Sequence, residues 1–129
     1  MSWANLFAVA GGGALGASMR YGVNLLFVRQ GWYGLPAATF VVNVVGCLLA
    51  GLLLVWLDTR LHDALWWRNL LMVGFLGGLT TFSALGVEGF QLLRANRIDL
   101  FALTMLAHVA VGVLAVALGW RLGQGWLSH

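Results

Sequence analysis

The sequence predicts an all-α membrane protein with four transmembrane helices. Of its 129 residues, 61% are hydrophobic and only 9% are charged, whereas a soluble domain carries roughly 25% charged residues. A helix that crosses a membrane needs about 20 predominantly apolar residues, and four segments of the chain are long enough. These segments span about residues 3–28, 36–57, 69–93 and 100–122, and they make up a single transmembrane domain.

The tryptophans support the same four spans. Trp is enriched where a membrane meets water, and each one falls at or near the end of a segment: Trp3, Trp32, Trp56, Trp66, Trp67, Trp120 and Trp126. The first residues of the chain hold no Lys or Arg, so they make a poor start for a signal peptide. We therefore expect the first segment to be retained as a membrane helix.

The first segment carries Arg20, several residues before its end. A buried arginine costs at least about 2.5 kcal/mol near the bilayer centre and less near its edge. The guanidinium either snorkels to the interface or forms a positive vestibule that draws anions toward a pore. Gly12 and Gly16, small residues at four-residue spacing, permit another helix to pack closely, within one copy or between copies.

The second segment carries polar side chains near its start. Pro36 suits the first turn of this helix, where its missing amide donor does no harm. Asn43 lies about a third of the way along, with Thr39 one turn before it. An amide at this depth either bonds a neighbouring helix or donates to a dehydrated anion. Cys47, the single cysteine, is expected to be a small packing residue.

The third segment holds the stretch Gly74–Ser83, which reads Gly-Phe-Leu-Gly-Gly-Leu-Thr-Thr-Phe-Ser. Glycine costs about 1 kcal/mol in a helix interior, and Thr and Ser hydroxyls can bond the backbone groups that a break releases. We interpret the stretch as a helix broken at Gly77–Thr81, at membrane depth. The alternative is a continuous helix whose glycines let a neighbour approach closely.

Such a break has electrostatic consequences. Carbonyls at the end of the first half-helix favour a cation, and amides at the start of the second half favour an anion. Thr80, Thr81 and Ser83 add hydroxyls at this point. The positive ring edge of Phe82 can face an anion, although a membrane phenylalanine more often only packs. Glu88, later in the segment, can relay protons, sense pH or pair with an arginine.

The fourth segment carries one histidine at membrane depth, His108, whose default role is that of a hydrogen-bonded packing residue. A single histidine offers no metal site. Ala115 and Gly119 repeat the small-residue spacing of the first segment. The sequence contains no nucleophile–base set, phosphate loop or cofactor motif, so the protein is not expected to be an enzyme.

Positive charge is balanced between the two ends of the predicted bundle. The two sets are Arg60, Arg68 and Arg121 at one end and Arg29, Arg94 and Arg97 at the other. The usual excess of positive charge on the cytoplasmic side is therefore absent. Either the protein inserts both ways up and forms an antiparallel two-fold dimer, or the insertion machinery of the cell sets one orientation.

Three stretches of the chain form a joint pattern: Gly11–Ala17 followed by Arg20 and Tyr21, Thr39–Gly46, and Gly74–Ser83. Together they resemble the Fluc/CrcB fluoride channels over the first three helices, while the fourth matches only in its small residues. The resemblance implies a passive, highly selective channel that exports cytoplasmic fluoride and relieves its toxicity. It also implies an antiparallel dual-topology homodimer in the inner (plasma) membrane.

The resemblance assigns roles to individual residues. The fluoride pathway would contain Asn43, Phe82, Thr39, Thr81, Ser83, Arg20, Leu85 and His108. Asn43 would help to coordinate the ion, Phe82 would be a pore phenylalanine, and Arg20 would serve the vestibule. A structural sodium ion would lie at the dimer centre, held by the backbone carbonyls of Gly77 and Thr80 from each copy.

The sequence departs from the family pattern at two places. The family usually has a second phenylalanine three residues after the first, where this chain has Leu85. Leucine offers no aromatic edge, so another group must take that role or conduction is altered. On the fourth helix, relatives tend to carry Tyr and Ser where this chain has Thr104 and His108. A titratable side chain there predicts that fluoride throughput depends on pH.

Two other classes of function also fit a small membrane protein. A proton-coupled multidrug exporter can be a four-helix antiparallel dimer, but it needs a carboxylate in its first helix, and this first segment has none. A non-transporting assembly subunit need not place polar residues at membrane depth.

A fluoride pore needs no ATP site, because the membrane potential drives the trapped anion out at about 2.3 kcal/mol per charge per 100 mV.

Overall fold

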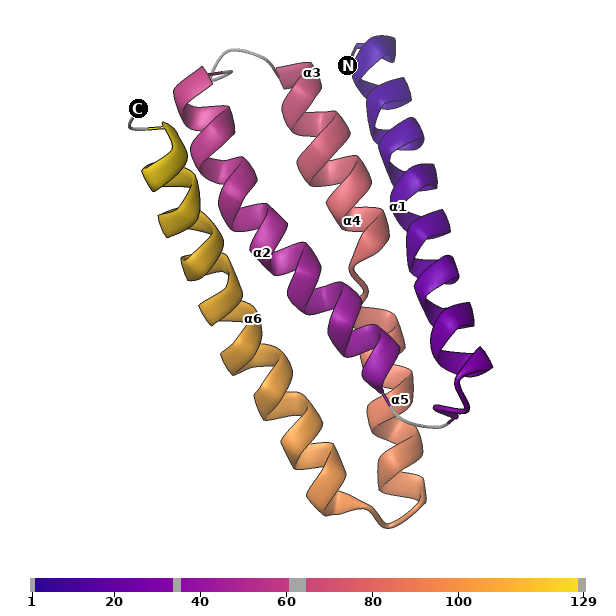
Figure 1. Cartoon of the computed structure of the whole chain (residues 1–129). Coiled ribbons are helices and arrows are strands. Elements are labelled where there is room, and N and C mark those ends of the chain that lie inside the picture. The colour runs from indigo at the N-terminus through magenta and orange to yellow at the C-terminus, as the bar shows by residue number, and fades with distance from the viewer. Residues whose placement is uncertain (1, 34–35, 61–64, 128–129) are drawn as a thin grey trace.

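The computed structural model describes residues 2–33, 36–60 and 65–127, and every regular element in these residues is a helix. In chain order the elements are α1 (Trp3–Arg29), α2 (Ala37–Arg60), α3 (Leu65–Arg68), the π-helix η1 (Asn69–Leu76), α4 (Gly77–Leu79), α5 (Phe82–Arg94) and α6 (Ile98–Leu127). α3, η1 and α4 follow one another in a single rod, and α5 continues its direction after a short gap (Figure 1). The predicted all-helical fold with four main helices is confirmed.

Three of the four helical rods are long and apolar enough to cross a membrane: Ala37–Thr59, Leu65–Arg94 and Ile98–Trp126. α1 has 27 residues, which is sufficient length for a span, but it is not among these three. Polar Ser18 and Asn24 and charged Arg20 dilute its apolar character. The crossing of the membrane by α1 therefore stays a prediction.

Glycines allow α1 to lie directly on the backbone of η1 and α4. A Cβ atom on Gly12 would lie 2.8 Å from the Phe75 amide nitrogen, and one on Gly16 would lie 2.7 Å from the Leu79 amide nitrogen. Real Cβ atoms do not approach this closely, so the two helices can pack in this way only because side chains are missing there. The small-residue spacing predicted on the first helix serves packing within the chain.

α2 and α6 form a second closely packed pair and run side by side over most of their length (Figure 1). A side chain on Gly51 would meet the carbonyl of Val116, and one on Gly119 would meet the carbonyl of Leu48. Ala115, one turn before Gly119, is also buried. The small residues of the fourth predicted segment thus contact α2 of the same copy.

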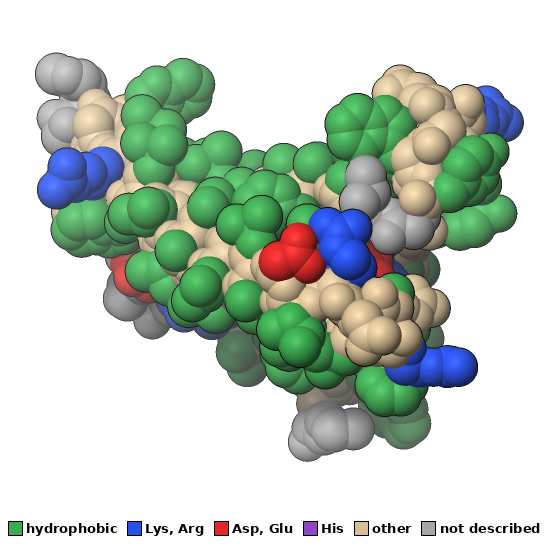
Figure 2. Space-filling view, turned by 90° about the horizontal axis from the view of Figure 1, so that it is seen from below, with side chains coloured by type: hydrophobic (Ala, Val, Ile, Leu, Met, Phe, Trp, Pro, Cys, Tyr) green, Lys and Arg blue, Asp and Glu red, His purple; other side chains and the backbone are tan. Residues whose placement is uncertain are grey.

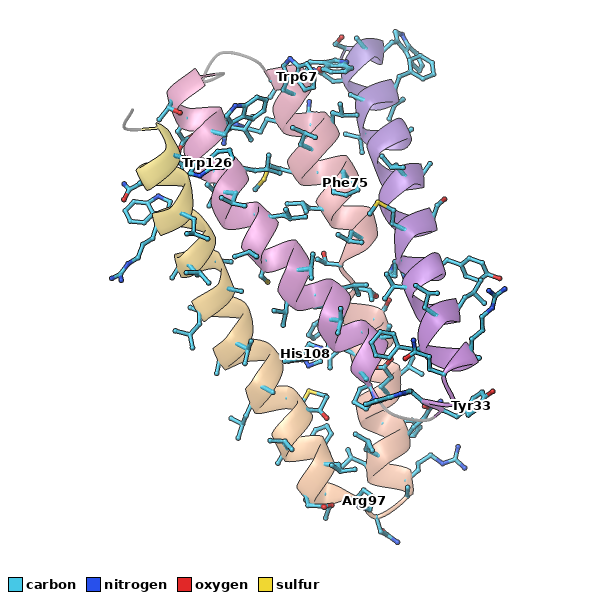
Figure 3. All side chains as sticks on the ribbon, viewed as in Figure 1. Tyr33, Trp67, Phe75, Arg97, His108 and Trp126 are labelled. Atoms are coloured by element: carbon cyan, nitrogen blue, oxygen red, sulfur yellow. The ribbon has the colours of Figure 1, made fainter. Side chains whose placement is uncertain are left out.

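The outer surface is mostly apolar, as a lipid-facing surface requires. Large hydrophobic side chains are exposed on every long helix, for example Phe7, Phe90 and Val109. Figure 2, viewed from the end where α5 connects to α6, shows many hydrophobic side chains together with several charged groups at that end. The start of α1, the end of α2, α3 and the end of α6 all lie at the opposite end (Figure 1), and they carry Trp3, Trp56, Trp66, Trp67, Trp120 and Trp126. Trp32, which follows α1, lies at the end where Figure 3 labels Tyr33.

Candidate functional site

The candidate site is built around Thr80 and Thr81, which lie between α4 and α5. Both residues have extended backbones, with φ −84° and ψ 155° at Thr80 and φ −151° and ψ 120° at Thr81. Gly77, in contrast, keeps helical angles of −61° and −34°. The non-helical residues are therefore the two threonines, and the preceding glycines belong to α4.

The threonine hydroxyls bond backbone groups on both sides of the two extended residues. The Thr80 hydroxyl donates to the carbonyl of Leu76 at 2.8 Å. The Thr81 hydroxyl accepts the amide of Ala84 at 3.1 Å and so caps the start of α5, and it lies 3.1 Å from the Ser83 hydroxyl. An N-cap of this kind contributes about 1 kcal/mol, which favours the start of a new helix at Phe82.

Asn43 on α2 pairs with the extended backbone through both ends of its amide. Its Oδ1 accepts the Thr81 amide at 2.8 Å, and its Nδ2 donates to the Thr81 carbonyl at 3.2 Å. The side chain thus supplies the partners that a continuous helix would have given to Thr81. A primary amide carries two N–H groups, so one Nδ2 proton is left for a further acceptor.

The same rearrangement changes the surroundings of three backbone carbonyls. In a continuous helix the Gly77 carbonyl would accept the Thr81 amide, but that amide donates to Asn43. The Thr80 carbonyl would accept the Ala84 amide, which instead donates to the Thr81 hydroxyl. Gly77 and Thr80 therefore lose their regular helical partners, and their oxygens suit a cation. The Gly78 carbonyl accepts Nε of Arg20 at 3.0 Å.

Arg20 reaches into the bundle, because its Nε bond to Gly78 joins α1 to α4. Its side chain lines a cavity of about 310 Å³ that we call the inner cavity. The lining residues are Ala17, Arg20, Tyr21, Asn24, Ala38, Thr39, Val42, Thr81, Ala84 and Glu88. The cavity combines one guanidinium, hydroxyls, the Asn24 amide and the Glu88 carboxyl group, so its polar lining is suited to a small hydrophilic ion.

A second cavity of about 420 Å³, the outer cavity, shares Asn24 and Glu88 with the inner one. It also includes Trp32 and Tyr33, which follow α1, and Gln91 on α5. The two cavities therefore run from the end of the bundle where Figure 3 labels Tyr33 to the Asn43–Thr81 contact. Asn24 was not predicted from the sequence, although its position one turn after Arg20 is a signal that points to it.

A third hollow of about 330 Å³, the side cavity, lies on the other side of the Asn43–Thr81 contact. Its lining residues are Asn43, Cys47, Thr80, Thr81, Phe82, Leu85, His108 and Val109. Phe82 is 85% exposed, whereas Leu85 is buried. Figure 3 shows the His108 side chain between α6 and the region where α2 and α5 cross. The structure thus gathers seven of the predicted pathway residues around two cavities that share Thr81. Ser83 lines neither cavity, and its hydroxyl contacts that of Thr81.

The family of the chain follows from comparison with known proteins. The family model described as CrcB-like protein, Camphor Resistance (CrcB), matches residues 7–120. The chain belongs to the CrcB family. The match includes the whole third rod and most of the fourth helix, so the resemblance seen in the first three segments extends over nearly the full chain.

Relatives with known names agree with the CrcB assignment. A protein of Xylella fastidiosa (strain 9a5c), named fluoride-specific ion channel FluC, is 40% identical over 121 residues, which cover 94% of this chain and 85% of the relative. The protein of the same name from Chloroflexus aurantiacus (strain ATCC 29366 / DSM 635 / J-10-fl) is 40% identical over 120 residues, or 93% and 95% of the two chains. That of Xanthomonas euvesicatoria pv. vesicatoria (strain 85-10) is 38% identical over 125 residues, or 97% and 93%.

Proposed function

We propose that this CrcB-family protein is a passive, selective fluoride channel and not an enzyme. The observation that carries the proposal is near-full-length similarity, at about 40% identity, to proteins named fluoride-specific ion channel FluC. The site geometry is consistent with it, because two cavities lined by hydrogen-bond donors converge on the Asn43–Thr81 contact. Fluoride is small and strongly hydrated, so its pathway must offer donors that replace water.

In this proposal the donors act in sequence along the cavities. Arg20 gives the inner cavity its positive charge and attracts the anion. Thr39 and Thr81 add hydroxyls to the inner cavity, and Ser83 adds one beside Thr81. The second Nδ2 proton of Asn43 donates to the ion as it passes Thr81. The edge of the exposed Phe82 ring completes the contact in the side cavity, where Leu85 and His108 form the rest of the wall.

We also propose that the active form is an antiparallel homodimer. In one copy, the side cavity is open and 85% of Phe82 is exposed, so a second copy is needed to enclose the ion. One copy carries most of its tryptophans at one end of the bundle. Inverting the partner gives each membrane face an aromatic belt, and it also accounts for the even distribution of arginines.

A sodium ion at the dimer centre would have a structural role. The proposed ligands are the carbonyls of Gly77 and Thr80, whose helical amide partners bond elsewhere. Carbonyl oxygens are suitable ligands for a hard cation. When bound, the ion would supply positive charge between two anion pathways and hold the two third rods together.

The third rod would then be a membrane helix interrupted at its centre, within a protein of four spans. Its extended backbone would be tolerated at membrane depth because Asn43 bonds both the amide and the carbonyl of Thr81, and the Thr80 amide bonds the Leu76 carbonyl. The Thr80 carbonyl would be left for the proposed sodium ion. The proposed location is the inner (plasma) membrane. There the negative-inside potential drives fluoride outward, at about 2.3 kcal/mol per charge per 100 mV.

The decisive experiment is fluoride efflux from proteoliposomes, with sodium present and chloride as the comparison ion. We expect fast fluoride release, negligible chloride release and loss of the fluoride signal in Asn43→Ala. Gln124→Ala, at an exposed position on α6, is the matched control and should conduct like the wild type. Absence of fluoride flux from a folded wild-type dimer would refute the channel and favour a non-transporting assembly subunit. Proton-driven export of organic cations would instead support the multidrug exporter.

A further inference from the structure

Two buried side-chain atoms stand out in the described part of the chain because they have no hydrogen-bond partner. They are Oε2 of Glu88 and Nε2 of His108. A buried polar atom without a partner destabilises a protein, so each such atom calls for an explanation, such as a bound water, an ion or a functional role. Both atoms here belong to side chains that can gain or lose a proton.

The bonds of His108 fix which of its ring nitrogens is available. Nδ1 lies 2.8 Å from the carbonyl of Thr104, and a carbonyl can only accept, so Nδ1 must carry a proton. The neutral ring then presents a bare lone pair at Nε2, whereas the charged ring presents an N–H donor there. The ring is held in place by an edge contact with Phe40, at 5.2 Å between centroids. Protonation therefore converts Nε2 from an acceptor into a donor without requiring the ring to move.

Glu88 is anchored in a similar way through one of its two oxygens. Oε1 accepts a hydrogen bond from the hydroxyl of Thr39 at 2.5 Å, and Oε2 has no hydrogen-bond partner. Glu88 lines both the inner and the outer cavity. An ionised carboxylate at this place repels an approaching anion, and a protonated one does not. The charge state of Glu88 therefore bears directly on anion movement through both cavities.

The two groups lie on opposite sides of the Asn43–Thr81 contact, which separates the inner cavity from the side cavity and which we call the constriction. Glu88 lines the inner cavity, His108 lines the side cavity, and Thr81 belongs to both. Other ionisable groups that line these cavities are Arg20, Tyr21 and Tyr33 beside Glu88, and Cys47 from α2 beside His108. Among these groups, only Glu88 and His108 have a buried side-chain atom without a hydrogen-bond partner in the described residues.

We propose that Glu88 and His108 form a proton-linked pair that sets how readily the constriction accepts an anion. With no added proton the pair carries one negative charge, and with one proton it is neutral. A second proton makes it positive. Each step favours the anion, and histidine is the side chain that ordinarily changes charge between about pH 5 and 8. The inference rests on the proposed channel function and adds a regulation to it: anion flux rises as pH falls.

The test is the fluoride efflux rate of proteoliposomes at about pH 8 and about pH 5.5, with the leak of protein-free liposomes subtracted at each pH. We expect the wild-type rate to rise on the order of tenfold, the lower end of what a charge in a cleft does to local ion concentration. A wild-type rate that differs less than about twofold would overturn the inference while leaving the channel intact. No fluoride flux at either pH would refute the channel itself.

Two uncharged variants separate the electrostatic effect from structural damage. Glu88→Gln keeps an acceptor for Thr39 but removes the negative charge, so its rate at about pH 8 should rise toward the wild-type rate at about pH 5.5. His108→Gln removes the positive charge that the histidine can gain and leaves only Glu88 to bind a proton, so its rate at about pH 5.5 should stay below that of the wild type. The two variants thus change the profile in opposite directions, which loss of folding cannot do. If the fluoride efflux rate of both variants depended on pH as that of the wild type does, the proposed Glu88–His108 pair would be contradicted.

Discussion

The two halves of the third rod meet their neighbours in different ways. η1 and α4 lie directly against α1, because Gly12 and Gly16 bring the two backbones together and leave no space for a side chain. α5 touches α2 through the Thr39–Glu88 bond, and the space between α5, α1 and the start of α2 forms the inner and outer cavities. Side-chain size accounts for the difference: glycine rows close an interface, whereas Arg20, Asn24 and Glu88 hold one open and supply its polar surface.

The first half of the third rod, packed on α1, stabilises the fold, whereas the second half carries polar groups of the candidate site. The glycine interface gives the rod a fixed position, so Thr80 and Thr81 can leave the helix without the two halves drifting apart. The polar residues then act from a rigid support, which a precise ion site requires. The following predictions test this division, starting with the largest expected effect.

A side chain added to the glycine interface between α1 and the first half of the third rod should destabilise the protein most. A Cβ on Gly16 would contact the Phe75 carbonyl and lie 2.7 Å from the Leu79 amide nitrogen, and a backbone cannot yield as a side chain does. Gly16→Val should lower the free energy of unfolding by about 3 kcal/mol or more. Gly22→Ala on the same helix, where nothing lies within 4 Å, is the control. Thermal unfolding in detergent measures both, and equal midpoints would show that α1 does not pack as described.

Adding a charge to the cavity half should abolish transport and leave the fold intact. Asn43→Asp keeps the oxygen that accepts the Thr81 amide but removes the Nδ2 donor and introduces a negative charge. The fluoride efflux rate should fall about 100-fold, because a charge of the wrong sign excludes ions from a narrow path. Gln124→Glu makes the same charge change at an exposed position and should conduct normally. Similar rates in the two variants would place the pathway away from Asn43.

The Thr39–Glu88 bond should matter for stability by an intermediate amount. Thr39→Val removes the 2.5 Å donor to Oε1 of Glu88 and leaves the whole carboxyl group without a partner. The free energy of unfolding should fall by about 1–3 kcal/mol. Thr39→Ser retains the hydroxyl and should lose much less. Equal losses in the two variants would mean that the methyl group of Thr39, and not its hydroxyl, stabilises the bundle.

The smallest effect is expected outside the membrane. Arg68 and Asp58 form an ion pair at 2.8 Å near the packed end of the third rod, with side-chain exposures of 39% and 65%. Solvent screens such a pair, so Asp58→Asn should lower the free energy of unfolding by less than about 1 kcal/mol. The difference from the wild type should vanish at high salt. A larger loss would indicate that this end of the bundle, and not the glycine interface, carries the stability.

Local chemistry was enough to predict much of the site from the sequence. Thr80, Thr81 and Ser83 stand next to one another in the chain, so the place where hydroxyls meet the backbone could be found without a structure. The glycines before them were harder to interpret. Gly77 and Gly78 suggested the break itself, but both remain in α4, and a Cβ on Gly78 would lie 2.5 Å from the Gly13 carbonyl oxygen.

Contacts between distant segments could not be predicted in the same way. Asn43 and Thr81 are 38 residues apart, and their reciprocal bonds depend on the positions of α2 and the third rod. Glu88 had three possible roles in the sequence, and its bond to Thr39 was not one of them. His108 is hydrogen-bonded and packs on Phe40, as predicted, but nothing in the sequence indicated that its Nε2 would be buried without a partner.

The sequence by itself determined the class of the protein. Long apolar runs with tryptophan at their ends can form only membrane helices, because a backbone in lipid must satisfy its own hydrogen bonds. Only the tertiary structure decided which polar atoms find partners and which remain free. That outcome depends on angles and distances between helices, which are set by close contacts such as Gly16 on Leu79, and no periodicity along the chain encodes them.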